Sequence, residues 1–404
     1  MADVLICGGG VAGSALAILL GRSRLSVELF ERGNFPREKP CGEGLMPAGV
    51  AVLERLGLRQ IACAAAFRGV RYRFDKRSVE APFPRANGRV ICGRGVRRKY
   101  LDTLLFQTAG ETPGVRAFTN ARVDRLLWEK GRVAGVIVNG EPERARLVLA
   151  ADGAHSRIRR ELGFDASRSR KRMGIRVHYR LARGKEQNCW VDVSLRKRYE
   201  LYVTPLPDGE ILIAALANAE GGESIQSRFR RWIFDEPFLA DLLEGAEQIS
   251  DPACASWPVN NAKPRNAPGV VLLGDAAGSI DPISGGGMTH ALLTAELLSK
   301  YIRSGIECGE EWMTSFERER QKLLRRFRRL TWALLRLAAY PAAAEQILTL
   351  AGQFPSVISY FAGIASGVSH LSDCCRAEGK AKVVRTGVLT LEKMPSISRP
   401  EHGS

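Results

Sequence analysis

Two distant glycine-bearing segments constrain the fold of this chain more than any other feature. One is VLICGGGVAG, which ends at Gly13, and the other is GVVLLGDAAGSIDPISGGGM, which runs from Gly269 to Met288. In both, a short apolar run typical of a buried strand leads into a glycine-rich turn and then into a helical pattern. Such strand–turn–helix units are typical of an α/β fold that binds a nucleotide at the carboxyl ends of its strands.

The N-terminal segment has the spacing G-x-G-x-x-G in Gly8, Gly10 and Gly13. In a dinucleotide-binding turn the first glycine permits the tight bend, the second lets the backbone approach a pyrophosphate, and the third lets the helix pack on the strand. The helix that follows directs the free N–H groups of its first turn at the phosphates. Val11 and Ala12 therefore belong to the predicted site.

A second strand, 26–30, ends at the acidic residue Glu31, and Glu31 and the following Arg32 are both predicted to bind the cofactor. The separation of Glu31 from Gly13 along the chain is typical of the acid that binds a ribose hydroxyl. This unit alone fits NAD as well as FAD, so a further motif must choose between them.

The later segment indicates FAD. Its strand, 270–274, places Asp275 at the carboxyl end, where a carboxylate can accept hydrogen bonds from the ribityl hydroxyls of a flavin. A glycine-opened helix follows, and its N–H groups favour the negative charge that develops at the pyrimidine edge of a flavin on reduction. The residues of this loop and helix start are Asp281, Pro282, Gly285, Gly286, Gly287 and Met288.

A third motif, D-G-x-x-S-x-x-R, lies between these two, after a strand at 147–151. Its residues are Asp152, Gly153, Ser156 and either Arg159 or Arg160. With G-x-G-x-x-G and the pair Gly274–Asp275, the chain resembles the family of FAD-dependent aromatic hydroxylases and geranylgeranyl reductases over roughly residues 1–330. The resemblance implies an α/β fold with a Rossmann-type FAD-binding domain, and an oxidoreductase activity.

Two further segments fall within the resemblance. FPREKPCGEGLMPAGVAVLERLG, residues 35–57, is similar to the P-R-x-K-x-C-G-x-G-L segment of the reductase branch and its hydroxylase relatives, which implies that Cys41 and Gly42 lie beside the cofactor. Cys41 either faces the flavin or the substrate, or fills a gap in the core. Lys39 and Glu43 are either polar contacts near the cofactor or surface residues. RRKYLDTLL, residues 97–105, is similar to a helix that supplies an arginine to FAD, by register Arg98.

The FAD-binding domain is predicted to be discontinuous. The predicted divisions are 1–65, 86–170 and 259–305 for this domain, 66–85 and 171–258 for an antiparallel substrate-binding sheet, 306–372 for a helical C-terminal region and 373–404 for a flexible tail. Alternating segments such as FRGVRYRF (67–74) and MGIRVHYRL (173–181) predict strands of that sheet. Alternation places Arg176 and His178 on one face, with Tyr202 nearby, as predicted substrate contacts. A structural role is the alternative for His178.

The net charge of +17 comes from 60 dispersed lysines and arginines that follow no nucleic-acid-binding fold. We therefore expect no nucleic acid as partner, and a field that favours NADPH, anionic substrates, acidic partners or anionic lipid. The nine cysteines include no C-x-x-C pair and the five histidines show no metal-ligand spacing, which predicts neither a disulfide framework nor a metal site. The apolar start has the pattern of a first strand rather than a secretory signal, which favours the cytoplasm.

The C-terminal region has two unusual helical segments. SFERERQKLLRRFRRLTWALLRLAAY carries eight basic residues from Arg318 to Arg336. It predicts either a helix packed on the core with a basic face in water, or a peripheral contact with a membrane surface or an acidic partner. Residues 346–372 carry no formally charged side chain, which predicts buried or interfacial helices that line an apolar substrate entrance; Pro355 argues against a membrane span.

The resemblance leaves several reactions open on one scaffold. We favour a monooxygenase in which FAD, reduced by NADPH or NADH, captures molecular oxygen as a C4a-hydroperoxide and hydroxylates an aromatic, polyketide-like or other apolar, lipid-like molecule. The stretch YVTPLP, 202–207, lacks the tryptophan of the reductase motif Y-x-W-x-F-P, which disfavours the alternative of prenyl double-bond reduction. A halogenase is less favoured because the sequence contains no W-x-W-x-I-P, and a flavin-binding redox partner without turnover is a further alternative.

The sequence assigns no catalytic base, because oxygen transfer of this kind needs mainly a dry, preorganised pocket. It also contains no second G-x-G-x-x-G for a nicotinamide. Either NADPH or NADH docks briefly without a domain of its own, or a separate reductase donates the electrons.

Overall fold

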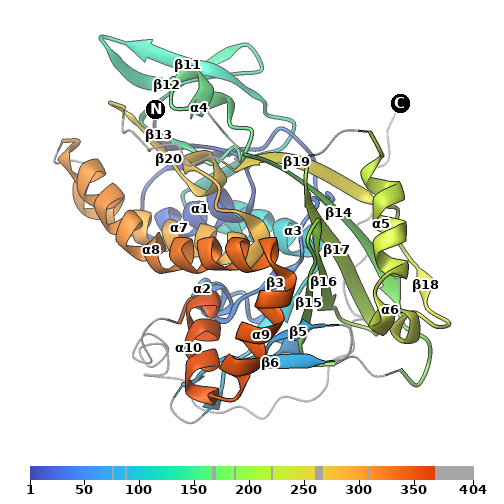
Figure 1. Ribbon diagram of the computed structural model, residues 1–404. Coiled ribbons are helices and arrows are strands. Elements are labelled where there is room, and N and C mark those ends of the chain that lie inside the picture. The colour runs from blue at the N-terminus through green and yellow to red at the C-terminus, as the bar shows by residue number, and fades with distance from the viewer. Residues whose placement is uncertain are drawn as a thin grey trace, which may run out of the picture.

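The computed structural model describes residues 1–74, 77–86, 89–165, 170–185, 188–219, 222–259, 267–306 and 309–368. Two large sheets form the body of the molecule, and helices pack against both (Figure 1). The predicted α/β fold, with a Rossmann-type sheet, a second sheet and a helical C-terminal region, is confirmed. The predicted flexible tail lies outside the described residues.

The first sheet is of the Rossmann type. Its parallel strands lie in the order β10 (Val115–Phe118), β2 (Val27–Phe30), β1 (Ala2–Cys7), β13 (Glu141–Ala150) and β20 (Val270–Leu272). The antiparallel hairpin of β11 (Val123–Glu129) and β12 (Arg132–Val138) continues from β13. Because β1, β13 and β20 are neighbours and parallel, their carboxyl ends bring the three glycine motifs to one edge.

Helices cover both faces of this sheet. On one face lie α1 (Val11–Gly21), α3 (Arg98–Glu111) and α7 (Gly287–Gly305), with α2 (Pro47–Arg55) packed on α7. Leu16, Leu101, Leu149 and Leu292 from these elements belong to one buried cluster. The short α4 (Arg157–Glu161) lies on the other face beside β11. Strands buried on both faces are rich in aliphatic residues, as β1 and β13 are.

The second sheet faces the carboxyl edge of the first. Its strands are β18 (Glu247–Gln248), β14 (Arg170–Arg180), β17 (Glu210–Asn218), β16 (Tyr199–Pro205), β15 (Val191–Leu195), β5 (Gly69–Arg73) and β6 (Ser78–Pro82), in that order, and β19 (Ala253–Val259) also pairs with β14. The outer face packs against α5 (Ile225–Phe234) and α6 (Pro237–Leu242) through cluster residues such as Ile213 and Phe229. Register places Arg176, Ala214 and Tyr202 side by side on the inner face.

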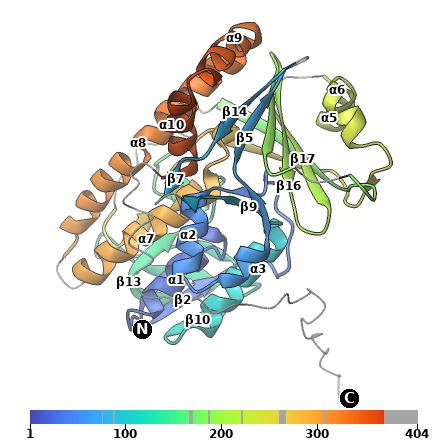
Figure 2. The same ribbon diagram turned by 90° about the horizontal axis from the view of Figure 1, so that it is seen from below.

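Three C-terminal helices pack together beside the inner face of the second sheet. They are α8 (Glu311–Ala339), α9 (Pro341–Gly352) and α10 (Pro355–Ser366), and Figure 2 shows them along one edge of the molecule, away from α5 and α6. No single helix of the described part of the chain has the length and apolarity to cross a bilayer; α9 and α10, bent by 113°, meet that test only as a pair.

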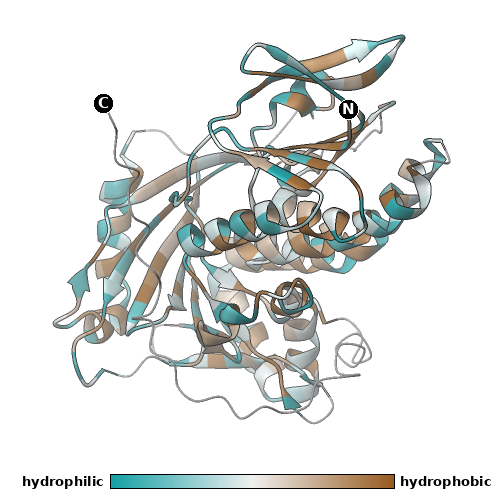
Figure 3. Cartoon of the chain, turned by 180° about the vertical axis from the view of Figure 1, so that it is seen from behind, coloured by the Kyte–Doolittle hydropathy of each residue, from teal (hydrophilic) through white to brown (hydrophobic). Residues whose placement is uncertain are grey.

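Short elements complete the fold. They are β3 (Gly44–Leu45), β4 (Ala65–Phe67) and β9 (Gly93–Gly95) in one small sheet, the β7 (Arg85–Ala86) and β8 (Arg89–Val90) pair, and the 3-10 turns η1 (Arg59–Cys63), η2 (Gly274–Ala277) and η3 (Pro282–Ser284). Figure 3 shows hydrophobic residues along the strands of both sheets, whereas α8 alternates between hydrophobic and hydrophilic residues.

Two predicted strands have other bounds in the structure. The single strand predicted over 67–74 is divided between β4 and β5, because Arg68 donates its N–H to the Cys189 carbonyl and Gly69 lies too close to Ala81 for a side chain. The strand predicted over 270–274 ends at Leu272, since Gly274 has φ +60° and turns the chain into η2. The predicted antiparallel sheet also contains one parallel pair, β5 with β15. These strands are joined through the first sheet, so no hairpin fixes their direction.

Candidate functional site

The glycine turn after β1 has the geometry that its spacing predicts. Gly8 has φ +113°, and a Cβ there would lie 2.5 Å from the Ala151 carbonyl oxygen, so only glycine fits. A Cβ on Gly13 would lie 2.0 Å from the Gly8 carbonyl oxygen, because α1 packs directly on the turn. Gly10 differs, since the nearest atom to its Cβ position is Arg37 Nη2 at 3.9 Å. The space before the N-terminus of α1 is therefore open.

Glu31 is buried at the end of β2 and holds this turn in place. One carboxylate oxygen accepts the Gly9 N–H at 2.9 Å, and the other accepts the Gly33 N–H at 3.0 Å. Arg37 pairs with the same carboxylate at 3.2 Å. A carboxylate offers about four lone-pair sites, so these contacts leave capacity for a ribose hydroxyl. The neighbouring Arg32 is exposed.

Asp152 caps α4 and keeps one oxygen without a partner. Its Oδ2 accepts the Arg157 N–H at 2.8 Å, whereas its buried Oδ1 has no hydrogen-bond partner among the described residues. Buried oxygens without a partner are uncommon in proteins and call for an explanation, which a bound ligand supplies. Gly153, next along the chain, has φ +85° and nothing within 4 Å of its Cβ position.

Arg159, and not Arg160, occupies the place of the motif arginine. It is buried, and its Nη1 donates to the carbonyl oxygens of Asp275 and Ala276, each at 3.2 Å. Its Nε pairs with Asp165 at 2.6 Å. Arg159 thereby fastens the D-G motif after β13 to the G-D motif after β20.

A cavity lies between η2, η3 and the first turn of α7. Its lining includes Gly274, Asp275, Gly278, Asp281, Gly287 and His290. The Cβ position of Gly274 is 3.1 Å from Ala12, so the G-D motif lies against the first turn of α1. Asp275 is exposed, and nothing lies within 4 Å of the Cβ position of Gly287. These openings, with the free oxygen of Asp152, fit the pyrophosphate and hydroxyl groups of FAD.

Three cations gather next to the glycine turn. Arg98 is buried, and its guanidinium donates two hydrogen bonds of 2.8 Å to the Asp102 carboxylate. Arg37 Nη2 lies 3.8 Å from the same carboxylate. Burial alone would lower the pKa of Arg98, but the neighbouring Asp102 and Cys41 raise that pKa above its ordinary value. The charge of Arg98, followed by burial, lowers the pKa of Lys39. Such a cluster suits the negative charge of a pyrophosphate.

A buried hydrogen-bonded network joins the second sheet to the 38–43 loop. Glu43 has φ +55° and no exposed surface; its carboxylate accepts the Arg98 N–H at 2.9 Å and contacts His178 Nε2 at 2.8 Å. His178 Nδ1 lies 3.0 Å from Arg176 Nη1, a donor, so Nδ1 accepts and Nε2 donates to Glu43. Arg176 also pairs with Glu38. Both histidine nitrogens are therefore engaged, which supports the structural alternative for His178.

A second polar group joins the inner face of the sheet to η3. Arg172 pairs with Glu200 and lies 3.4 Å from Asp281, whose Oδ1 accepts the Ile283 N–H. Tyr202 donates to the Ile283 carbonyl oxygen at 3.3 Å, and burial raises its pKa well above the ordinary value. Of the three predicted substrate contacts, Tyr202 lies in this second group, whereas Arg176 and His178 lie in the network around Glu43.

The structure gathers the predicted cofactor residues around the carboxyl edge of the first sheet, and their binding roles stay predictions. The residues there are Gly8, Gly10, Val11, Ala12, Gly13, Glu31, Arg32, Cys41, Gly42, Arg98, Asp152, Gly153, Gly274, Asp275, Pro282, Gly285, Gly286, Gly287 and Met288. Sequence reasoning missed Arg37 and Asp102, although the spacing of Asp102 from Arg98 on a helix was a usable signal. It also missed Arg172, and Ser250, whose Oγ accepts the His178 N–H at 2.9 Å; no motif marks either residue.

His290 on the first turn of α7 makes stability depend on pH. Its ring packs against Phe327 at a centroid distance of 4.1 Å, and burial, with the charge of Arg328, lowers its pKa from 6.5 to about 3. The folded state therefore keeps His290 neutral, and stability is lost as the pH falls from 6.5 toward 3. At pH 5 we expect a loss of about 2 kcal/mol relative to pH 8 from this group. Denaturant unfolding at a series of pH values measures this effect. The free energy of unfolding should fall less steeply between pH 6.5 and 5 in His290→Gln than in the unchanged protein, whereas the exposed His155→Gln should not alter that fall. An equally steep fall in His290→Gln would contradict the assignment.

This chain resembles known FAD-binding proteins in sequence and in fold. A family model described as an FAD binding domain matches residues 1–330. A menaquinone reductase of Mycolicibacterium smegmatis is 28% identical over 319 residues, which cover 75% of this chain and 77% of the relative. A squalene monooxygenase of Brassica napus is 27% identical over 342 residues, or 76% of this chain and 62% of the relative. A solved flavoprotein/dehydrogenase from Cytophaga hutchinsonii shares the fold, with TM-score 0.78, 19% identity, and 91% and 92% of the two chains covered.

Proposed function

This chain belongs to the FAD binding domain family, and we propose that this FAD-dependent oxidoreductase is a monooxygenase that hydroxylates an aromatic or polyketide-like ring of a lipid-like substrate. The end of β16 carries the proposal. Where the reductase motif Y-x-W-x-F-P has tryptophan, this chain has Thr204, whose Oγ1 donates a 2.8 Å hydrogen bond to the Gly42 carbonyl oxygen. A small, buried side chain thus meets the Cys41–Gly42 turn in the place of the bulky indole ring of the reductase motif.

The wall beside Thr204 suits an apolar ring with an oxygen substituent. Tyr72 and Tyr202 belong to a cluster of mainly apolar side chains with Val193, Ile283 and Leu330. Burial raises the pKa of Tyr72 to about 12 and that of Tyr202 well above its ordinary value. Both hydroxyls therefore stay protonated. Tyr202 already donates to the Ile283 carbonyl oxygen, so Tyr72 would donate the hydrogen bond to a phenol or carbonyl oxygen, and Tyr202 could accept one.

FAD, when bound, supplies the oxygen-activating chemistry, with NADPH or NADH as the proposed electron donor. Glu31 would hold its ribose, the cations near Gly10 its pyrophosphate, and Asp275 its ribityl chain. The chain's own part in the reaction is to hold the ring beside the cofactor and to exclude water through the sheet and α8. The squalene monooxygenase relative supports oxygen insertion on this scaffold.

Reduction of a prenyl double bond is the second candidate, and a different observation favours it. Cys41 and Gly42 match the reductase segment, and Cys41 lies next to the buried guanidinium of Arg98. With the hydride supplied by bound, reduced FAD, a proton donor in this position would supply the proton that completes the addition of hydrogen to an alkene. The menaquinone reductase relative supports this candidate.

Removal of oxygen separates the two candidates. We expect the purified yellow protein with NADPH to convert a long-chain alkylresorcinol in air and to leave it unchanged under argon. Menaquinone serves as the reductase probe in the same two atmospheres. Consumption of menaquinone under argon, with no conversion of the resorcinol in air, would contradict the monooxygenase proposal.

A further inference from the structure

We propose that the face formed by α8, α9 and α10 docks on the surface of an anionic lipid bilayer. The inference concerns a surface apart from the flavin site and does not depend on which reaction that site performs. Two features of the face carry it, a stripe of cations on α8 and an uncharged, aromatic-rich outer surface on α9 and α10.

The basic stripe consists of Arg318, Lys322, Arg325, Arg329 and Arg336. Steps of three and four residues place these side chains on one face of α8, and all are exposed. The opposite face, which includes Phe316, Leu324 and Phe327, is buried. The stripe therefore contributes nothing to the core of the protein.

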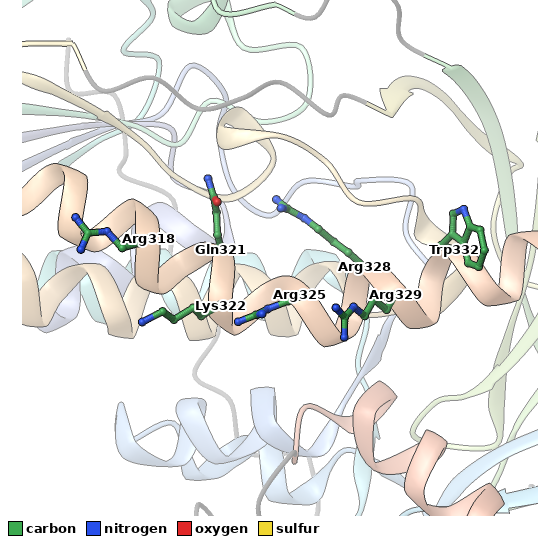
Figure 4. A pocket seen from close by; sticks show the side chains of 7 residues that line it. All are labelled: Arg318, Gln321, Lys322, Arg325, Arg328, Arg329 and Trp332. Atoms are coloured by element: carbon green, nitrogen blue, oxygen red, sulfur yellow. The ribbon is translucent and has the colours of Figure 1, made fainter.

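Much of this charge is uncompensated. Within the described residues, no ion pair is found for Arg318, Arg325 or Arg329, while Glu317 and Glu319 are engaged by Arg320 and Lys322. Figure 4 shows Lys322, Arg325 and Arg329 leaving α8 on one side, with Arg328 and Trp332 on the other, around a hollow that these side chains line. Cations held close together without carboxylates favour anionic groups from solution.

The apolar hairpin consists of α9 and α10. From Tyr340 to Val368 the chain contains one charged residue, Glu345. Inward side chains such as Leu348 and Ile358 join the buried cluster beside β6 and β15. The hairpin nonetheless leaves large apolar side chains 47–71% exposed: Tyr340, Ile347, Leu350, Phe354, Tyr360 and Phe361. Exposed apolar surface of this extent is uncommon on a monomer and marks an interaction site.

The two features lie on one side of the molecule. α8, α9 and α10 are on the face turned to the viewer in Figure 1, and Figure 2 shows the same three helices along one edge. α8 contacts both α9 and α10, so the basic stripe and the apolar hairpin form adjoining parts of one surface.

A bilayer surface fits both parts at once. Arginine and lysine bind headgroup phosphates while their aliphatic stems lie against apolar groups, and aromatic side chains are favoured at the membrane interface. An acidic protein would neutralise the basic stripe but would leave the apolar hairpin in water. The bend of 113° between α9 and α10, with their inner sides packed on the protein, suits a hairpin that lies in the interface.

The same helices reach the proposed substrate site. Thr331 Oγ1 on α8 lies 3.1 Å from Ser284 Oγ of η3, and Leu330 packs in the cluster that contains Tyr202. If the proposed lipid-like substrate is correct, docking would place the substrate wall next to the membrane that holds it.

The test is flotation of the full-length, FAD-loaded protein with vesicles of phosphatidylcholine alone or mixed with phosphatidylglycerol. We expect binding to the anionic vesicles that weakens as salt is raised, and little binding to phosphatidylcholine. The combined change of Arg318, Lys322, Arg325 and Arg329 to Gln should weaken binding at least about tenfold. Leu350→Ser with Phe354→Ser should also weaken it.

Matched controls make the test specific. Arg183, Lys197, Arg198 and Arg230, changed together to Gln, remove the same charge from exposed positions on other elements and should leave binding unchanged. All of these side chains are exposed, so melting temperature and yellow colour should persist in every variant. Equal weakening by the stripe and control variants would overturn the proposal. So would binding to an acidic polypeptide without binding to anionic vesicles, which would indicate an acidic protein partner.

Discussion

Gly10→Ala should weaken FAD binding about ten- to a hundredfold while the melting temperature of the apoprotein stays unchanged. Gly10 has φ −81°, which alanine adopts readily, and its Cβ position has only Arg37 Nη2 near it, at 3.9 Å. The protein alone therefore has room for the methyl group. The space beside Gly10 is where a pyrophosphate would lie against the N-terminus of α1, so the added methyl group would collide with the ligand.

Fluorescence titration of FAD into the apoprotein, with thermal unfolding in parallel, measures this effect. Gly110→Ala is the matched control, because Gly110 lies in α3 and its Cβ would make an ordinary 3.5 Å contact with Ala117 of β10, so neither value should change adversely. Gly13→Ala should instead destabilise the fold itself, since its Cβ would lie 2.0 Å from a carbonyl oxygen. Unchanged FAD affinity in Gly10→Ala would show that the cofactor does not pass in front of this helix.

Glu43→Ala should lower the free energy of unfolding by about 2–5 kcal/mol. It would leave two buried donors without an acceptor, the Arg98 N–H and the His178 Nε2–H. It would also detach the 38–43 loop from the second sheet, so we expect turnover to fall more than stability alone explains. Urea unfolding and steady-state turnover measure the two effects.

The control for Glu43 lies in the same network. Glu38 pairs with the buried Arg176, but the Glu38 side chain is 46% exposed and water can take its place, so Glu38→Ala should cost less stability than Glu43→Ala. The loss in the free energy of unfolding for Glu43→Gln should lie between those of Glu43→Ala and Glu38→Ala, since the amide oxygen of glutamine can still accept one hydrogen bond. A Glu43→Ala variant as stable as Glu38→Ala would contradict the assigned network.

The part of the site that follows from local sequence could be predicted, because backbone geometry dictates it. Gly8 and Gly13 stand where a Cβ would strike a carbonyl oxygen, so their spacing is fixed by the turn. Glu31 directly follows β2, and Asp275 comes three residues after the end of β20. Helix and strand types were predictable for the same reason, since the 3.6 and 2 residue periods are local.

Long-range pairings could not be predicted. Glu43 and His178 are brought together by the register of β14 and by a loop from the other sheet, and no spacing along the chain encodes that contact. The choice between Arg159 and Arg160 also depended on which side chain reaches the carbonyls of η2. Alternation over 67–74 failed because the break at Arg68 is set by contacts with β6 and residue 189, not by local preference.

The most direct test of the central claim is the origin of the oxygen in the product. The purified protein is supplied with FAD, NADPH, a long-chain alkylresorcinol and isotopically labelled dioxygen, and the product is analysed by mass spectrometry. Monooxygenation predicts a product that has gained one labelled oxygen atom from dioxygen, with none from labelled water. A product that has gained hydrogen without label, or conversion that proceeds equally without oxygen, would contradict the account.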